Sequence, residues 1–78
     1  MRIEGMKFVP ERLVVAAGDR ITWTNRDFVP HTVTAKAANV ESGDLAQDAR
    51  WTWTARQKGE MPYICRLHPV MRGTLVVE

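Results

Sequence analysis

Three side chains that could bind a metal lie near the carboxyl end of the chain, in the segment YICRLHPVMRG (63–73). Cys65, His68 and Met71 follow one another at intervals of three residues, and Cys65 is the only cysteine. A thiolate and a thioether are soft ligands and an imidazole is a borderline one, so the set suits copper better than calcium, magnesium or manganese. Pro69 and Gly73 predict a tight loop here, in which the three donors can converge on one point.

A fourth donor has to come from another segment, and His31 is the only other histidine. It follows Pro30 in NRDFVPHTVT, at the start of an expected strand. Two histidines, a cysteine and a weakly bound methionine form the ligand set of a blue-copper electron-transfer centre. Taken singly, each residue is better explained as a buried or surface side chain that binds no metal. Their joint occurrence favours a metal site.

The elements that must position these residues are predicted to be β-strands throughout. The pattern indicates strands within 2–10, 12–17, 20–25, 31–35, 51–54, 61–65 and 73–78, separated by turn signals. In RITWTN, for example, Ile21 and Trp23 alternate with threonines and so share one face. We therefore predict an all-β fold, an antiparallel sandwich or barrel of about seven strands.

Some local features refine this prediction. The apolar parity of the first strand slips at Gly5, which indicates a bulge or a bend. Only residues 44–50 could hold a helical turn. Trp23, Trp51 and Trp53 alternate with threonines and are expected to pack the sandwich or shield its face.

Composition excludes several classes of protein. The chain has 78 residues, 45% of them hydrophobic and 26% charged, which predicts one globular domain over residues 1–78. No apolar run reaches the roughly 18 residues of a membrane span. No basic and apolar leader opens the chain, so no secretory signal is expected within it. The net charge is only +2 and the basic residues are scattered, which argues against nucleic-acid binding.

The chain resembles the cupredoxins, and within them the amicyanins and small plastocyanin-like domains. MKFVPERLVVAAGDRITWTNRD is similar to the first three strands of the family, VPHTVT to its isolated-histidine strand, and GEMPYICRLHPVMRGTLVVE to its closing hairpin. Two residues separate each pair of ligands in the loop from Cys65 to Met71, the short spacing that marks amicyanins. The resemblance covers nearly the whole chain and implies a cupredoxin-like Greek-key sandwich or barrel.

The resemblance also implies roles for individual residues. His31, Cys65 and His68 form the trigonal plane around one copper ion per chain, and Met71 is the axial ligand. Asn25 matches an asparagine that ties the two ligand loops together in amicyanins. Thr32 stands beside the first histidine, where many relatives have an asparagine.

The function implied is electron transport between redox partner proteins, such as a dehydrogenase, a cytochrome or an oxidase. The electron is expected to enter and leave through His68, within an apolar patch that makes a small transient interface: Met6, Pro30, Leu67, Pro69 and Val70. The resemblance further implies a monomer in the periplasm or another extracytoplasmic space.

Other functions are weaker interpretations of the same residues. A periplasmic copper chaperone, storage or resistance protein could use the same ligands, and it would release the metal easily and show a weak blue band or none. A module that binds partners without a metal ranks last, because the ligands are intact. An enzyme is not expected, since two histidines cannot supply a trinuclear copper centre and one cysteine cannot supply a dinuclear purple site.

Overall fold

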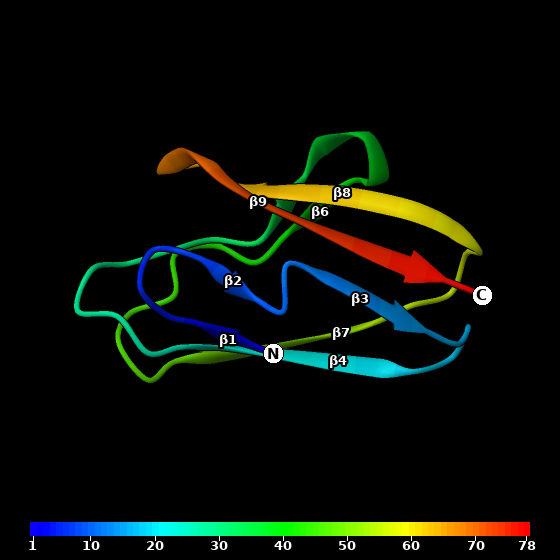
Figure 1. Cartoon of the computed structure of the whole chain (residues 1–78), viewed down its shortest axis with the longest axis horizontal. Helices are drawn as coiled ribbons and strands as arrows, with labels where there is room; N and C mark the ends of the chain where they lie inside the picture. Colours follow the sequence, from blue (N-terminus) through cyan, green and yellow to red (C-terminus); the bar gives the residue numbers. More distant parts are fainter.

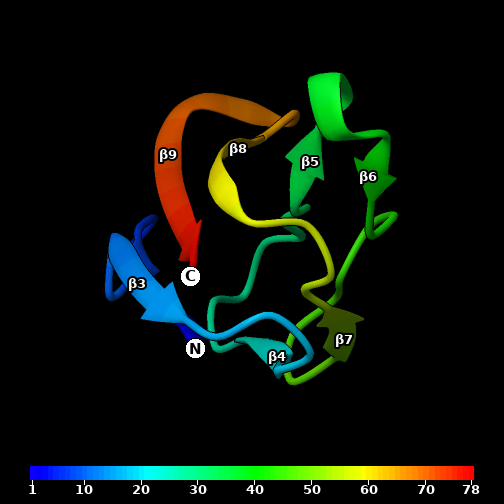
Figure 2. The same ribbon diagram turned by 90° about the vertical axis from the view of Figure 1, so that its right-hand side faces the viewer.

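The computed structural model describes residues 1–78 as two β-sheets that face each other (Figure 1). In spatial order the first sheet contains β2 (Phe8–Val9), β1 (Arg2–Ile3), β4 (Arg20–Asn25) and β7 (Arg50–Thr54). The second contains β3 (Arg12–Val15), β9 (His68–Val77), β8 (Gly59–Cys65), β5 (Thr34–Ala35) and β6 (Val40–Glu41). Seen from the end in Figure 2, the two sheets enclose a common interior. The prediction of an all-β sandwich is confirmed.

The sheets are mixed, which corrects the expectation of purely antiparallel pairing. β1 runs parallel to β4, and β3 runs parallel to β9, while the other pairs are antiparallel. Both parallel pairs join strands that do not follow each other in the sequence. Only strands joined by a short hairpin are obliged to be antiparallel, so local patterning could not reveal these two pairings.

The interior follows the alternation of β4. Ile21, Trp23 and Asn25 are buried, and the threonines between them are half-buried. The Trp23 ring is completely buried and lies 5.5 Å from the Trp51 ring, centroid to centroid, across the β4–β7 pair. Its indole N–H donates to the Tyr63 hydroxyl at 3.3 Å, which links the first sheet to β8 of the second. The predicted packing role of Trp23 is therefore confirmed.

Two local predictions have opposite outcomes. The bend at Gly5 is confirmed, because Gly5 and Met6 both adopt positive φ angles, 64° and 60°, in the turn between β1 and β2. The helical turn that residues 44–50 could have held does not form, and that segment was not the only one able to hold a turn. The chain's one helical turn is η1 (Lys36–Ala38), whereas Leu45 is buried and forms an isolated bridge with His31. No helix in the structure is long and apolar enough to cross a membrane.

The hairpin of β8 and β9 carries the candidate ligands near the carboxyl end. A turn at Arg66 and Leu67 separates the strands, and β9 begins at His68. The loop was predicted to extend to Gly73, and it is much shorter in the structure. The pairing register shifts at Ile64 and Cys65. This turn, drawn in orange, lies at the same left-hand end of Figure 1 as the β1–β2 turn and the segment after β4.

Candidate metal centre

The thiol of Cys65 is completely buried at the end of β8. Cys65 pairs with His68 across the hairpin, and directly opposed residues of an antiparallel pair have neighbouring side chains. The Sγ atom of Cys65 lies 3.7 Å from Nδ1 of His68. Sheet pairing thus brings together two of the predicted ligands.

His31 approaches the same sulfur from a segment far away in the sequence. Its Nδ1 lies 3.6 Å from Sγ of Cys65, and the side chain is completely buried. Two backbone hydrogen bonds hold His31 against Leu45: His31 N donates to Leu45 O at 3.1 Å, and Leu45 N donates to His31 O at 2.8 Å. The backbone of the third predicted ligand is therefore anchored independently of the β8–β9 hairpin.

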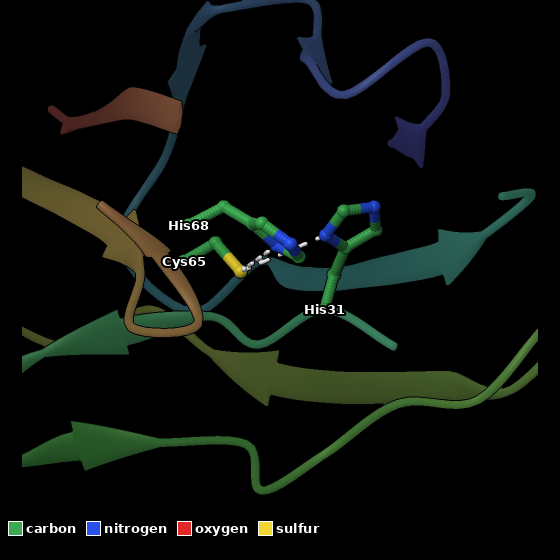
Figure 3. Close-up of side chains that lie close together, drawn as sticks. All are labelled: His31, Cys65 and His68. Atoms are coloured by element: carbon green, nitrogen blue, oxygen red, sulfur yellow. Dashed lines mark hydrogen bonds between the residues drawn. The ribbon is translucent and has the colours of Figure 1, made fainter. Parts of the chain in front are cut away.

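The thiol and the two imidazoles form a compact donor set (Figure 3). One ligand atom from each of His31, Cys65 and His68 can be chosen so that all lie within 4.8 Å of one another. Metal–sulfur bonds of about 2.3 Å and metal–imidazole bonds of about 2.0–2.1 Å place sulfur and nitrogen about 3.5–3.8 Å apart at tetrahedral to trigonal angles. The observed sulfur–nitrogen distances of 3.6 and 3.7 Å match this range, so the residues fit a metal ion.

Met71 lies in β9, on the hairpin that carries Cys65 and His68, and its side chain is buried. In the pairing of β8 with β9, Ile64 faces Arg72 and Cys65 faces His68, which leaves residues 69–71 as extra residues on β9. Such an irregularity redirects side chains relative to a regular strand. The role of Met71 as a fourth ligand stays a prediction.

The second ring nitrogen of His31 binds a carboxylate. Nε2 of His31 lies 2.9 Å from Oδ2 of Asp27. An ionised carboxylate only accepts hydrogen bonds, so Nε2 carries the proton and the lone pair of a neutral ring is on Nδ1, which faces Cys65. Asp27 was not among the residues predicted from the sequence. A carboxylate four residues before a candidate histidine ligand was the available signal.

Asp27 is itself held by the β1–β2 turn. Gly5 N donates to Oδ1 at 2.9 Å, and Met6 N donates to Oδ2 at 3.0 Å. Burial raises the pKa of Asp27, but the Met6 amide, His31 and the Gly5 amide together outweigh it and leave the pKa below its ordinary value of 3.8. Asp27 is therefore an ionised acceptor that joins the amino-terminal turn to His31.

The sequence profile of the cupredoxin-like domain family matches residues 1–77. The chain belongs to the cupredoxin family. The likeness predicted from the ligand spacing and the strand pattern is thereby confirmed.

Characterised relatives of this cupredoxin include amicyanins. It is 34% identical to amicyanin-alpha of Methylorubrum extorquens in an alignment 83 positions long, gaps included, which covers the whole chain and 70% of that protein. It is 35% identical to amicyanin of Paracoccus denitrificans in an alignment 81 positions long, which covers 97% of the chain and 62% of that protein. For amicyanin of Paracoccus versutus the identity is 32%, and 61% of the relative is covered.

Solved amicyanin structures share the fold of this cupredoxin. A Cu(I) form of one amicyanin variant superimposes with a TM-score of 0.94 at 33% identity, covering 99% of the chain and 78% of the amicyanin. An oxidised form of another variant gives the same TM-score, identity and coverage. The predicted cupredoxin-like fold is confirmed.

Asn25 braces the histidine segment of this cupredoxin from inside. The completely buried amide donates through Nδ2 to Val29 O at 2.9 Å and to Leu45 O at 2.8 Å. Its Oδ1 accepts the Asp27 N–H at 2.9 Å. These bonds tie together the 26–31 and 44–48 segments; none reaches the hairpin that carries Cys65.

Thr32 makes the link between the two ligand segments. Its backbone N–H donates to Sγ of Cys65 at 3.4 Å, and its hydroxyl accepts the backbone N–H of Arg66 at 2.9 Å. The side chain is completely buried. Thr32 therefore joins the segment after His31 to the turn after Cys65, the connection that the resemblance had assigned to Asn25.

The predicted patch residues are all exposed, and they lie on the three chain segments that meet at this end of the cupredoxin: Met6, Pro30, Leu67, Pro69 and Val70. Val70 is 88% exposed. His68 is partly exposed, in contrast to His31. Two further exposed apolar residues, Phe28 and Val29, were not predicted. The Phe28 side chain is 89% exposed, and the sequence shows it only as an apolar residue shortly before His31.

Proposed function

We propose that this cupredoxin is a one-electron carrier in which His31, Cys65, His68 and Met71 hold a single copper ion. The observation that carries the proposal is the convergence of the Cys65 thiol with two imidazole Nδ1 atoms, at 3.6 and 3.7 Å. Such a set, completed by a weak axial thioether, is that of blue-copper centres. The solved Cu(I) form of an amicyanin variant supports copper as the metal.

Bound copper supplies one-electron redox chemistry between Cu(I) and Cu(II). The work of the chain is to keep the ligands in one arrangement whichever state is present. The β8–β9 pairing holds Cys65 beside His68, and the bridge to Leu45 holds the backbone of His31. Asp27 fixes the ring orientation and the tautomer of His31. Ligands fixed in this way need little rearrangement on reduction or oxidation.

The exposure of the proposed ligands supports His68 as the point of electron entry and exit. His31, Cys65 and Met71 are buried, while His68 is partly exposed. The exposed apolar side chains nearby in the sequence, such as Val70, suit a small and transient contact with a redox partner such as a dehydrogenase, a cytochrome or an oxidase. Membership of the cupredoxin family supports a monomer in the periplasm or another extracytoplasmic space.

The burial of three proposed ligands favours an electron carrier over a copper-handling protein. A chaperone or storage protein has to release its metal, whereas His31 and Cys65 are completely shielded from solvent. Metal exchange through such a site requires local opening of the fold. Copper handling is therefore the alternative function that the test below has to distinguish from electron transfer.

The test is to add Cu(II) to the metal-free protein and record the visible spectrum. We expect an intense absorption band towards the red end, from charge transfer between the Cys65 thiolate and copper. The Cys65→Ser variant should lose the band, because a serine hydroxyl is not a soft, ionised ligand. A tight but colourless complex in the wild-type protein would favour copper handling, and a band that survives in Cys65→Ser would refute the ligand assignment.

A further inference from the structure

A closed ring of hydrogen bonds joins the turn after Cys65 to the segment after His31. The backbone N–H of Arg66 donates to Oγ1 of Thr32 at 2.9 Å, and Oγ1 of Thr32 lies 2.9 Å from Oγ1 of Thr34. The Thr34 hydroxyl donates to Oε1 of Glu41 at 2.9 Å. The ring closes where Nε of Arg66 donates to the same Oε1 at 3.1 Å.

The chemistry of these groups fixes the donor and the acceptor of every hydrogen bond in the ring, so that both branches run from Arg66 to Glu41. The ionised Glu41 carboxylate can only accept, so the Thr34 hydroxyl has to donate its proton to Glu41. The oxygen of Thr34 can then only accept from the Thr32 hydroxyl, whose oxygen in turn accepts the Arg66 N–H. Each hydroxyl both donates and accepts, an arrangement in which neighbouring hydrogen bonds strengthen one another.

The ring lies where β5 and β8 of the second sheet have almost no backbone pairing with each other. β5 pairs with β8 only through Thr34 and Ile64, so no continuous ladder runs from the His31 segment to Cys65. Thr32 and Thr34 are buried, while Arg66 and Glu41 lie at the surface. The side chains of the ring therefore supply the connection that backbone pairing supplies elsewhere in the sheet.

We propose that this ring positions Cys65 relative to His31, which makes the surface residues Glu41 and Arg66 positioning residues of the metal centre. With the ring intact, Thr32 is held so that its backbone N–H lies against Sγ of Cys65 at 3.4 Å. Hydrogen bonds to the cysteine sulfur tune the properties of a blue-copper centre. The inference rests on the proposed function only for its effect on copper.

Two variants disrupt the ring. Thr34→Val keeps the branched shape and removes the hydroxyl. Glu41→Gln keeps the shape but removes the charge, and it leaves one accepting oxygen for the Thr34 hydroxyl, Nε of Arg66 and the Gly43 amide. Two matched controls leave it intact. Asp44→Asn weakens the second contact of Arg66, Nη2 to Oδ1 at 2.8 Å, which is outside the ring. Glu60→Gln weakens the ion pair with Arg12, N to O 3.5 Å, on the same sheet.

The first measurement is amide hydrogen exchange of the metal-free variants, followed by NMR. Loss of one hydrogen bond in the ring should speed the exchange of the Arg66 and Thr32 amides by roughly two- to tenfold, while both controls match the wild type. The expected result requires that amides in β4 and β7, outside the ring, stay unchanged. Ring variants that exchange at Arg66 and Thr32 like the controls would overturn the proposal.

The second measurement is the visible band and the reduction potential of the copper-loaded variants. Both should shift in the ring variants and stay at the wild-type values in Asp44→Asn and Glu60→Gln. Unshifted values in the ring variants would overturn the influence of the ring on the metal. A wild-type protein that gives no blue band would refute the proposed function. Amide exchange in the metal-free protein would still test whether the ring holds the two ligand segments together. If Thr34→Val fails to fold, both measurements are made on Glu41→Gln, which changes only a surface residue.

Discussion

Nε2 of His31 lies 2.9 Å from Oδ2 of Asp27, and the same carboxylate accepts the backbone N–H groups of Gly5 and Met6. One side chain thus fixes the imidazole and holds the β1–β2 turn over it. Carboxylates that bind the second nitrogen of a histidine ligand orient the ring and increase its basicity. The amino-terminal turn is therefore part of the support of the metal centre.

Replacing this carboxylate should weaken metal binding. Asp27→Asn leaves one accepting oxygen for three N–H donors, so the ring orientation of His31 is no longer fixed. We expect copper affinity to fall by about 10- to 100-fold, measured by competition with a chelator of known affinity. Asp48→Asn is the control, because Asp48 forms only an exposed ion pair with Arg26, N to O 3.5 Å. Equal affinities in the two variants would contradict the role of Asp27.

The axial position is tested by a pair of buried methionines. Met71→Leu keeps the apolar volume but removes the thioether, so the reduction potential and the visible spectrum should change while the protein still binds copper. Met61→Leu is the matched control, since Met61 is also buried but lies in the part of β8 that precedes Cys65 by four residues. If Met71→Leu has the spectrum and the potential of Met61→Leu, Met71 is not a ligand.

The exposed apolar side chains around the turns should control electron exchange. Val70→Lys places a charge on the exposed apolar patch around Leu67, Pro69 and Val70, the proposed docking face for partners. Two copies that meet there would repel each other. We expect self-exchange between reduced and oxidised protein to slow by about tenfold or more, measured by NMR line broadening. Val14→Lys, at a valine of β3 that is 53% exposed, should leave the rate unchanged. Equal slowing in both variants would point to net charge instead of the docking face.

The close approach of Gly73 to Tyr63 predicts a large effect on stability. A Cβ atom on Gly73 would overlap the buried Tyr63 ring, coming within 2.6 Å of Cε2. Gly73→Ala should lower the free energy of unfolding by about 1–3 kcal/mol, measured by urea denaturation of the metal-free protein. Combining it with Tyr63→Leu should cost less than the sum of the two single changes, because the shorter side chain removes the overlap. Additive costs would show that the overlap is relieved in some other way.

Glu41 predicts a pH dependence of stability. Burial raises the pKa of Glu41, but the Gly43 amide, the Thr34 hydroxyl and Arg66 together lower it below the ordinary value of 4.5. A carboxyl with a lowered pKa in the folded state stabilises the fold fully above its unfolded pKa, and loses this effect as the pH falls through the folded pKa. Glu41→Gln should therefore be less stable than the wild type at about pH 7, and the difference should shrink at about pH 3.

The measurement is urea denaturation of both metal-free proteins across this pH range. Glu60→Gln is the control, because no comparable set of donors surrounds Glu60, whose ion pair with Arg12 is exposed. A difference between wild type and Glu41→Gln that stays constant or widens on acidification would contradict the lowered pKa.

Much of this protein can be predicted from local sequence signals. Alternation with a period of two places Ile21 and Trp23 on one buried face, because successive side chains of a strand point to opposite sides. The softness of the donors in Cys65, His68 and Met71 indicates copper before any fold is known. Gly5 marks the bend of the first hairpin, since glycine adopts positive φ without steric cost.

The remaining features depend on contacts between distant segments. Cys65 meets His31 across 34 positions of the chain, and whether a histidine reaches a given sulfur depends on pairing register and loop paths. The same holds for the parallel pairing of β1 with β4, for the turn that binds Asp27, and for the ring through Thr32. Local patterns specify which face a side chain occupies. Packing of the two sheets determines which side chains meet there, and so places three donors from two separate segments at one point.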